Sequence, residues 1–170
     1  MADVLPDDSD SKVRQLYDYW RSIRPDGRRL PGRQHFDPID IPHLLSALWL
    51  LDVFHDPLRF RYRLISAAHV AVTGADRTGR WYDEAHPQYK SSPLYAKLAA
   101  AATQGAPTFR RGRPTVHIDK DYMSLETLLL PLARDGETVD MLLGITIYHR
   151  VPAQESDTRD GAGRHVAPPD

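Results

Sequence analysis

The feature that most restricts the fold of this chain is an Asp135-Gly136 pair set between two β-rich stretches. Residues 125–132 and 139–148 are dominated by aliphatic side chains with several β-branched and aromatic ones, a composition typical of strands. Asp-Gly is a strong signal for a hairpin turn, because glycine adopts a positive φ without steric cost. The sequence therefore predicts an antiparallel hairpin that turns over residues 134–137.

A second hairpin is expected upstream, where two short runs flank the turn residues 55–57. Residues 49–54 are mostly apolar, and residues 58–67 form a strand in which Arg59, Arg61 and Arg63 alternate with Phe60, Tyr62 and Leu64. Because strand side chains alternate between two faces, the arginines share one face and the aromatic residues the other. We expect the aromatic face to point inward. The opposite arrangement, with Arg63 inside as an anchor for an anionic ligand, stays open.

Two helices are predicted from spacing and capping residues. The first begins at Ser11 and ends before Pro25, because its apolar residues recur at helical intervals: Val13, Leu16, Tyr17, Trp20 and Ile23. The second covers residues 92–103, with Ser92 as its cap and Pro93 at its first position. A basic strand, typical of a sheet edge, follows at residues 109–116.

The order of helix, hairpin, helical middle and three strands predicts an α+β domain. We expect a five-stranded antiparallel sheet with flanking short helices and an N-terminal helix. The 170 residues suit one domain, which we place at residues 11–150. The acidic lead at residues 1–10 and the polar, Pro- and Gly-rich tail at residues 151–170 are expected to be disordered.

Motifs along the chain resemble those of a bacterial PAS-like domain family, over about residues 11–149. They are Trp20, Leu30-Pro31 with Arg33, the run 36–42 followed by Leu44-Leu45, residues 51–53, residues 60–64, residues 73–76 with Thr78-Gly79, Pro131-Leu132 and Asp135-Gly136. The chain departs from the family pattern at Ser66-Ala67, where the family carries glycine and threonine. A role for a glycine or threonine at that place is therefore not expected in this chain.

The resemblance implies a cavity between the sheet and the helices, in a stand-alone sensory or regulatory module. Such a module binds a small ligand or a protein partner and signals through a homodimer or partner contacts. The ligand-binding residues that it favours are Tyr62, Arg63, His69, Trp81 and Tyr95. Aromatic residues at these places either stack on a ligand or fill the core, and the second role is the commoner one. The resemblance names no cofactor. Some PAS relatives bind haem through one axial histidine, and His69 would be the residue to serve in that role here.

Composition argues against several other functions. The 22 basic and 23 acidic residues nearly balance, whereas a dedicated nucleic-acid binder is usually basic. The absence of cysteine excludes disulfides, thiolate metal sites and cysteine nucleophiles. None of the eight histidines has the spacing of a metal motif, so no metal is expected. No apolar run is long enough for a membrane span and no signal peptide is evident, so a cytoplasmic protein is expected.

Two alternatives stay open at this point. The first is a small cofactor-free α+β enzyme that uses Asp83, Glu84 and His86, which would require these three side chains to line one closed cavity. No catalytic motif supports it, so a protein without enzymatic activity is expected. The second is a nucleic-acid accessory protein that uses the arginines of residues 59–63 and 110–113.

Overall fold

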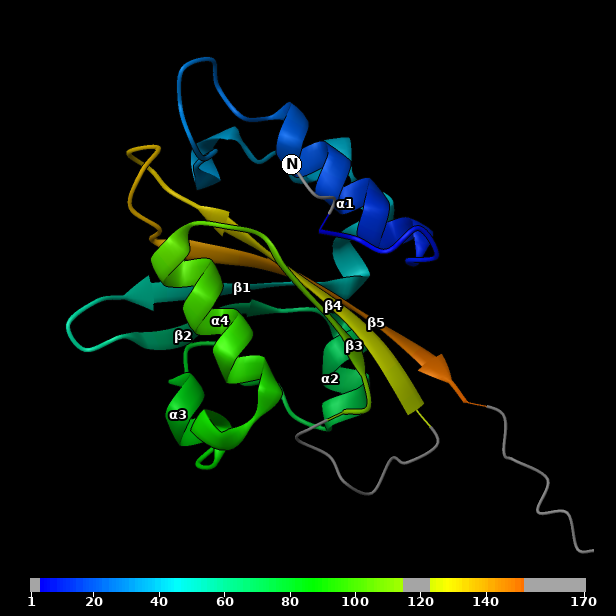
Figure 1. The fold of residues 1–170 in the computed structure, drawn as a ribbon. Helices are drawn as coiled ribbons and strands as arrows, with labels where there is room; N and C mark the ends of the chain where they lie inside the picture. Colours follow the sequence, from blue (N-terminus) through cyan, green and yellow to red (C-terminus); the bar gives the residue numbers. More distant parts are fainter. Residues whose placement is uncertain (1–3, 115–122, 152–170) are drawn as a thin grey trace, which may run out of the picture.

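The computed structural model describes residues 4–114 and 123–151, which form one five-stranded antiparallel sheet with helices on both faces (Figure 1). The strands are β1 (Leu48–Phe54), β2 (Arg59–Ile65), β3 (Thr108–Gly112), β4 (Met123–Leu132) and β5 (Met141–Arg150). Their order across the sheet is β2-β1-β5-β4-β3, so the last strand lies in the centre and β2 and β3 form the edges. The predicted fold class is confirmed.

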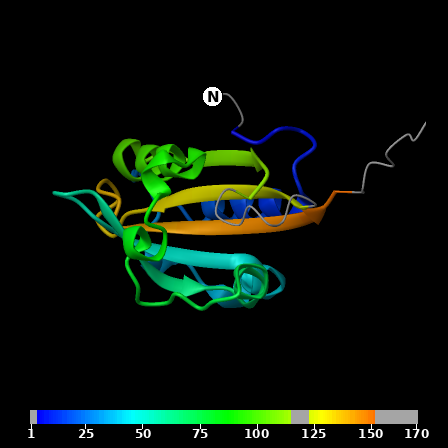
Figure 2. The same cartoon turned by 90° about the horizontal axis from the view of Figure 1, so that it is seen from below.

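The helices fall into an N-terminal group and a middle group. They are α1 (Ser11–Ser22), α2 (Ala67–Thr73), α3 (Tyr82–Ala85) and α4 (Pro93–Gln104), with 3-10 turns η1 (Arg33–His35), η2 (Pro38–Asp40), η3 (Pro42–Ala47) and η4 (Tyr89–Ser91). In Figure 2, α1 runs behind the sheet, and α2 and α3 lie in front of it. We call the face toward α2 and α3 the inner face, and the face toward α1 the outer face.

The predicted Asp135-Gly136 hairpin joins β4 to β5. Ten residue pairs link the strands, from Met123 opposite Arg150 to Leu132 opposite Met141. The Asp135 carboxylate accepts hydrogen bonds from the N–H groups of Glu137 and Thr138, and Gly136 has φ 87°. The hairpin is confirmed, although β5 begins at Met141 and not at residue 139.

Helix α1 covers the outer face of β4 and β5. Asp10 caps the helix, and its own N–H donates to the Glu126 carboxylate of β4 at 2.9 Å. Val13, Leu16 and Trp20 are buried, and the Trp20 indole donates to the carbonyl of Pro131 at 2.9 Å. The apolar stripe of this helix is therefore used against the sheet of its own chain.

Several predicted boundaries differ from those of the structure. In the segment 1–10, where a disordered lead was expected, Leu5 is only 2% exposed, whereas residues 6–8 are exposed. Strand β2 ends at Ile65, because the Ser66 hydroxyl accepts from the His69 N–H and caps α2. Helix α4 is capped by Ser92 as predicted. The end of the predicted basic strand, at residues 115–116, and residues 152–170 of the predicted tail lie outside the described residues.

Candidate ligand cavity

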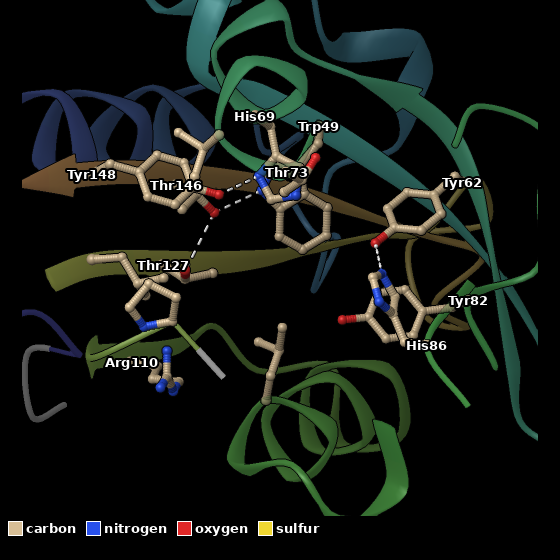
Figure 3. Close-up of a pocket in the computed structure, with 14 residues that line it drawn as sticks. Trp49, Tyr62, His69, Thr73, Tyr82, His86, Arg110, Thr127, Thr146 and Tyr148 are labelled. Atoms are coloured by element: carbon tan, nitrogen blue, oxygen red, sulfur yellow. Dashed lines mark hydrogen bonds between the residues drawn. The ribbon is translucent and has the colours of Figure 1, made fainter. Parts of the chain in front are cut away.

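A cavity lies between the inner face of the sheet and helices α2, α3 and α4 (Figure 3). It contains about 610 Å³ of space free of protein atoms, open solvent at its mouth included. The sheet supplies Trp49, Tyr62, Arg110, Leu125, Thr127, Thr146 and Tyr148; the helices and loops supply His69, Val72, Thr73, Tyr82, His86, Leu94 and Pro114. The lining is thus aromatic and apolar with a small number of polar groups, as in most small-molecule sites.

The floor of the cavity is built from Trp49 on β1 and a pair of threonines. A β-carbon at Gly144 would lie 2.3 Å from the Trp49 ring, so only glycine at this position of β5 allows the indole to lie flat on the sheet. The indole N–H donates to the Thr146 hydroxyl at 3.0 Å, and Thr146 contacts the Thr127 hydroxyl at 3.3 Å. The chain thereby satisfies these buried polar groups and fixes the ring.

Two tyrosine–histidine pairs form opposite walls of the cavity. The Tyr148 hydroxyl and His69 Nδ1 are 2.8 Å apart, and the Tyr62 hydroxyl and His86 Nε2 are 2.9 Å apart. Figure 3 shows the first pair beside the threonines and the second near Tyr82. Burial raises the pKa values of the Tyr62, Tyr82 and Tyr148 hydroxyls, so all three stay neutral at ordinary pH.

Arg110 brings a permanent positive charge to the cavity. Strand alternation places Arg110 on the inner face and Arg111 on the outer face. One Arg110 N–H donates to the carbonyl of Arg113 at 2.6 Å. Burial lowers the pKa of the Arg110 guanidinium, which nevertheless stays charged at neutral pH. Among the lining residues that the structure describes, it is the only Lys, Arg, Asp or Glu.

The predicted ligand-binding residues do not all meet at this cavity. Tyr62 and His69 line it, one on the sheet and one on α2. Trp81 packs on Phe54, with ring centroids 5.0 Å apart, and the Arg59 guanidinium lies 4.0 Å from the Trp81 ring centroid. Tyr95 packs edge-on against Tyr89, with centroids 5.0 Å apart. The last two aromatic rings therefore contact other side chains and not the cavity lining.

Arg63 lies on the outer face, so the open alternative of an inward Arg63 does not hold. Its side chain is 61% exposed, and its nearest acidic partner is Asp52 at 4.0 Å. Leu50 pairs with Leu64 and Leu51 with Tyr62, which leaves Arg63 as the extra residue of a β-bulge. The bulge also explains why Leu64, expected inside, is 45% exposed. Tyr62 and Phe60 are buried as expected.

The residues of the enzyme alternative are divided between two environments. The Asp83 carboxylate lies 3.0 Å from the Arg59 guanidinium, and Glu84 lies 3.6 Å from it. Only His86 lines the cavity. The three groups therefore do not line one closed cavity, which was the requirement for that alternative.

The arginines of β2 do not form an unpaired basic strip. Arg59 is paired with Asp83, and Arg61 lies 3.1 Å from Asp52. Arg111 on β3 bonds both Asp8 and Glu126. Arg59, Arg61 and Arg111 are therefore already paired within the chain, which weakens the nucleic-acid alternative for these three residues.

Sequence reasoning missed most of the cavity, yet one signal was present. Thr127, Thr146 and Tyr148 are polar residues at alternate positions of strands that are otherwise strongly apolar. Polar residues at such inward positions need partners, and they tend to gather at a site. For Arg110, no sequence signal distinguishes it from Arg111, because the facing of an edge strand depends on its register.

No group of three or more acidic or histidine side chains placed to hold a metal ion occurs within residues 4–114 and 123–151. Across the same residues, no helix combines the length and the apolar character that crossing a bilayer requires.

Comparisons with known proteins point to a single family. The sequence model of the PAS domain matches residues 9–147, well over half of the chain. Among solved structures, the chain is similar to a sensory box sensor histidine kinase from Vibrio cholerae, with 16% identity, a TM-score of 0.45, and coverage of 66% of this chain and 89% of that one.

The chain is also similar to an RNA-binding light-oxygen-voltage receptor, with 18% identity, a TM-score of 0.43, and coverage of 69% of this chain and 35% of that one. Comparison with curated proteins gives no match. The five-stranded antiparallel sheet, its helical middle and the family match over residues 9–147 agree, and the chain belongs to the PAS domain family.

Proposed function

We propose that this PAS domain is a sensory module that binds a small molecule in the cavity between the inner face and helices α2, α3 and α4. The observation that carries the proposal is the lining itself. Aromatic rings from β1, β2 and β5 surround polar groups that are held in fixed directions by hydrogen bonds. A rigid apolar lining with few, oriented polar groups is the usual form of a ligand site.

Binding would be passed on through the short helices that cover the cavity. Helix α2 has seven residues and α3 has four, and both contribute lining side chains. Short helices of this kind are held by tertiary contacts more than by their own propensity, so a ligand can shift their population. Helix α2 also contacts η3, the segment that leads into β1, which connects the cavity to the outer part of the domain. A second copy of the chain or a partner protein would read the change.

Native mass spectrometry of the purified protein, combined with its absorption spectrum, tests the proposal. We expect a bound small molecule that is released on denaturation. Val72→Phe extends a lining side chain of α2 into the cavity and should remove the bound mass. Val70→Phe is the matched control, because Val70 is partly buried on the same helix and does not line the cavity. The proposal fails if no small molecule is bound, or if Val72→Phe retains the bound mass as fully as Val70→Phe.

A further inference from the structure

Among the described residues that line the cavity, one arginine lies with hydroxyl, apolar and histidine side chains, and its charge defines a class of ligand. We propose that the cavity takes a small aromatic carboxylic acid, whose carboxylate binds Arg110 and whose ring lies among the aromatic side chains of the inner face. This inference rests on the proposed function, since it names the chemistry of the molecule that the cavity binds.

Within residues 4–114 and 123–151, Arg110 has no acidic side chain as a partner. Its one hydrogen bond in the described part of the chain is to the neutral carbonyl of Arg113, at 2.6 Å. No carboxylate of residues 4–114 or 123–151 lies within ion-pair distance of it. The neighbouring Arg111, in contrast, lies 2.9 Å from Asp8 and 3.0 Å from Glu126. An arginine has five N–H donors, so most of those of Arg110 remain for a ligand.

Burial makes an anionic partner favourable at this place. The Arg110 side chain is partly buried and lines the cavity, and removal from water disfavours its charged form. A carboxylate is planar and matches the guanidinium in a bidentate pair, whereas a phosphate dianion would call for further cations.

The rest of the lining favours a ligand whose uncharged part is an aromatic ring. Trp49, Tyr62, Tyr82 and Tyr148 present ring surfaces, and Leu94 and Val72 add aliphatic surface from the helices. Aromatic rings favour offset or edge-on contact with another ring. In Figure 3, Arg110 and Tyr148 lie toward one side of the cavity, and Tyr62, Tyr82 and His86 lie toward the other, so ring surfaces line the cavity from the charge onward. An acid with its ring next to one carboxylate fits this arrangement.

Calorimetric titration of three pairs of probes tests the inference: benzoate with benzamide, phenylacetate with phenylacetamide, and indole-3-acetate with indole-3-acetamide. Each amide keeps the shape of its acid and removes the charge. We expect at least one acid to bind, and its amide to bind about tenfold more weakly, because hydrogen bonds between charged groups are stronger than neutral ones.

Substitution compares Arg63, which the sequence named as a possible anion anchor, with Arg110, which lines the cavity in the structure. Arg110→Gln should abolish the preference for the acid, and Arg110→Lys should retain part of it. Arg63→Gln is the control and should leave affinity unchanged, because Arg63 is 61% exposed on the outer face. Thermal unfolding of each variant shows whether it folds, and the wild-type comparison of acid with amide needs no variant at all.

Three results would overturn the inference. Equal binding of acid and amide would show a cavity that takes ligands without regard to charge, and the proposed function would stand. Loss of acid binding in Arg63→Gln but not in Arg110→Gln would place the anion elsewhere. Failure of every acid to bind would also reject the inference, while native mass spectrometry judges the proposed function separately.

Discussion

The two faces of the sheet differ in whether their arginines are paired with acidic side chains. On the outer face, Arg61 lies 3.1 Å from Asp52, and Arg111 joins Asp8 to Glu126. On the inner face, the partner of Arg110 within the described residues is a carbonyl, and the other polar groups of the cavity are hydroxyls and imidazoles. Paired charges attach the N-terminal segment to the outer face. The inner-face arginine, which has no acidic partner in the part of the chain that the structure describes, is suited to an incoming anion.

The faces also differ in packing. Leu128, on the outer face between α1 and the sheet, is fully buried, and Trp20 and Leu16 pack in the same core. The inner face leaves a cavity among its side chains. Tight packing maintains the fold, and incomplete packing provides a place for a ligand. Three experiments test whether this division holds.

The largest effect is expected at alkaline pH, where the inner face should fail first. Burial raises the folded-state pKa values of Tyr62, Tyr82 and Tyr148 above the unfolded value of about 10. A raised pKa means that the folded state holds its proton more tightly, so this stability is complete below about pH 10 and is lost as pH rises further. Circular dichroism and phenolate absorbance against pH should show unfolding in that range.

Tyr148→Phe removes one of these buried hydroxyls and should move the alkaline midpoint to higher pH. Tyr17→Phe, on α1, is the control and should leave the midpoint in place. An unchanged midpoint in Tyr148→Phe, or equal shifts in both variants, would contradict the assignment of the alkaline transition to the cavity.

A substitution on the packed outer face should cost more than one on the cavity side. Leu128→Ala leaves a void beneath α1, and we expect a loss of about 3 kcal/mol in the free energy of unfolding. Leu94→Ala removes a partly exposed side chain that already borders empty space, and about 1 kcal/mol is expected. Urea denaturation of both variants measures the difference. Equal losses would show that the cavity is as tightly packed as the outer core.

The smallest of the three effects concerns the charges that fasten the N-terminal segment. Glu126 is 7% exposed at its side chain and binds Arg111 and the N–H of Asp10. Glu126→Gln keeps the shape but removes the charge, and we expect a loss of about 2 kcal/mol. Asp8→Asn, with a side chain 75% exposed, should cost clearly less, because solvent screens an exposed pair. If Asp8→Asn lowers the free energy of unfolding as much as Glu126→Gln, then solvent exposure does not determine how much these ion pairs contribute to stability.

The sequence predicted the elements well where a local signal was strong. The Asp135-Gly136 turn, the stripe of α1 and the Ser92 cap of α4 all depend on neighbours within a few residues, and all three are present in the structure. Such elements can be predicted from the sequence because their hydrogen bonds and side-chain faces depend on residues only a few positions apart. The PAS domain family followed from the order of these elements and the motifs between them.

The cavity could be predicted only in part. Tyr62 and His69 were chosen from the second strand and from the segment after it, and both line the cavity. Trp81 and Tyr95 were chosen for their place in the helical middle. The local sequence does not reveal where the ring of Trp81 points at the start of the four-residue α3, nor which side of α4 lies over the cavity. Arg63 lies on the outer face because Tyr62 faces inward, and the bulge at Arg63 turns Leu64 outward as well.

By itself, the sequence determined the β-hairpins, the helices, the family and the near-balance of charge, because each depends on composition or on short-range spacing. Only the tertiary structure decided which arginine meets the cavity. Arg110 and Arg111 are chemically identical neighbours, and the pairing of β3 with β4 places one inside and the other against Asp8 and Glu126. A shift of that register by one residue would exchange their surroundings, because strand side chains alternate with a period of two.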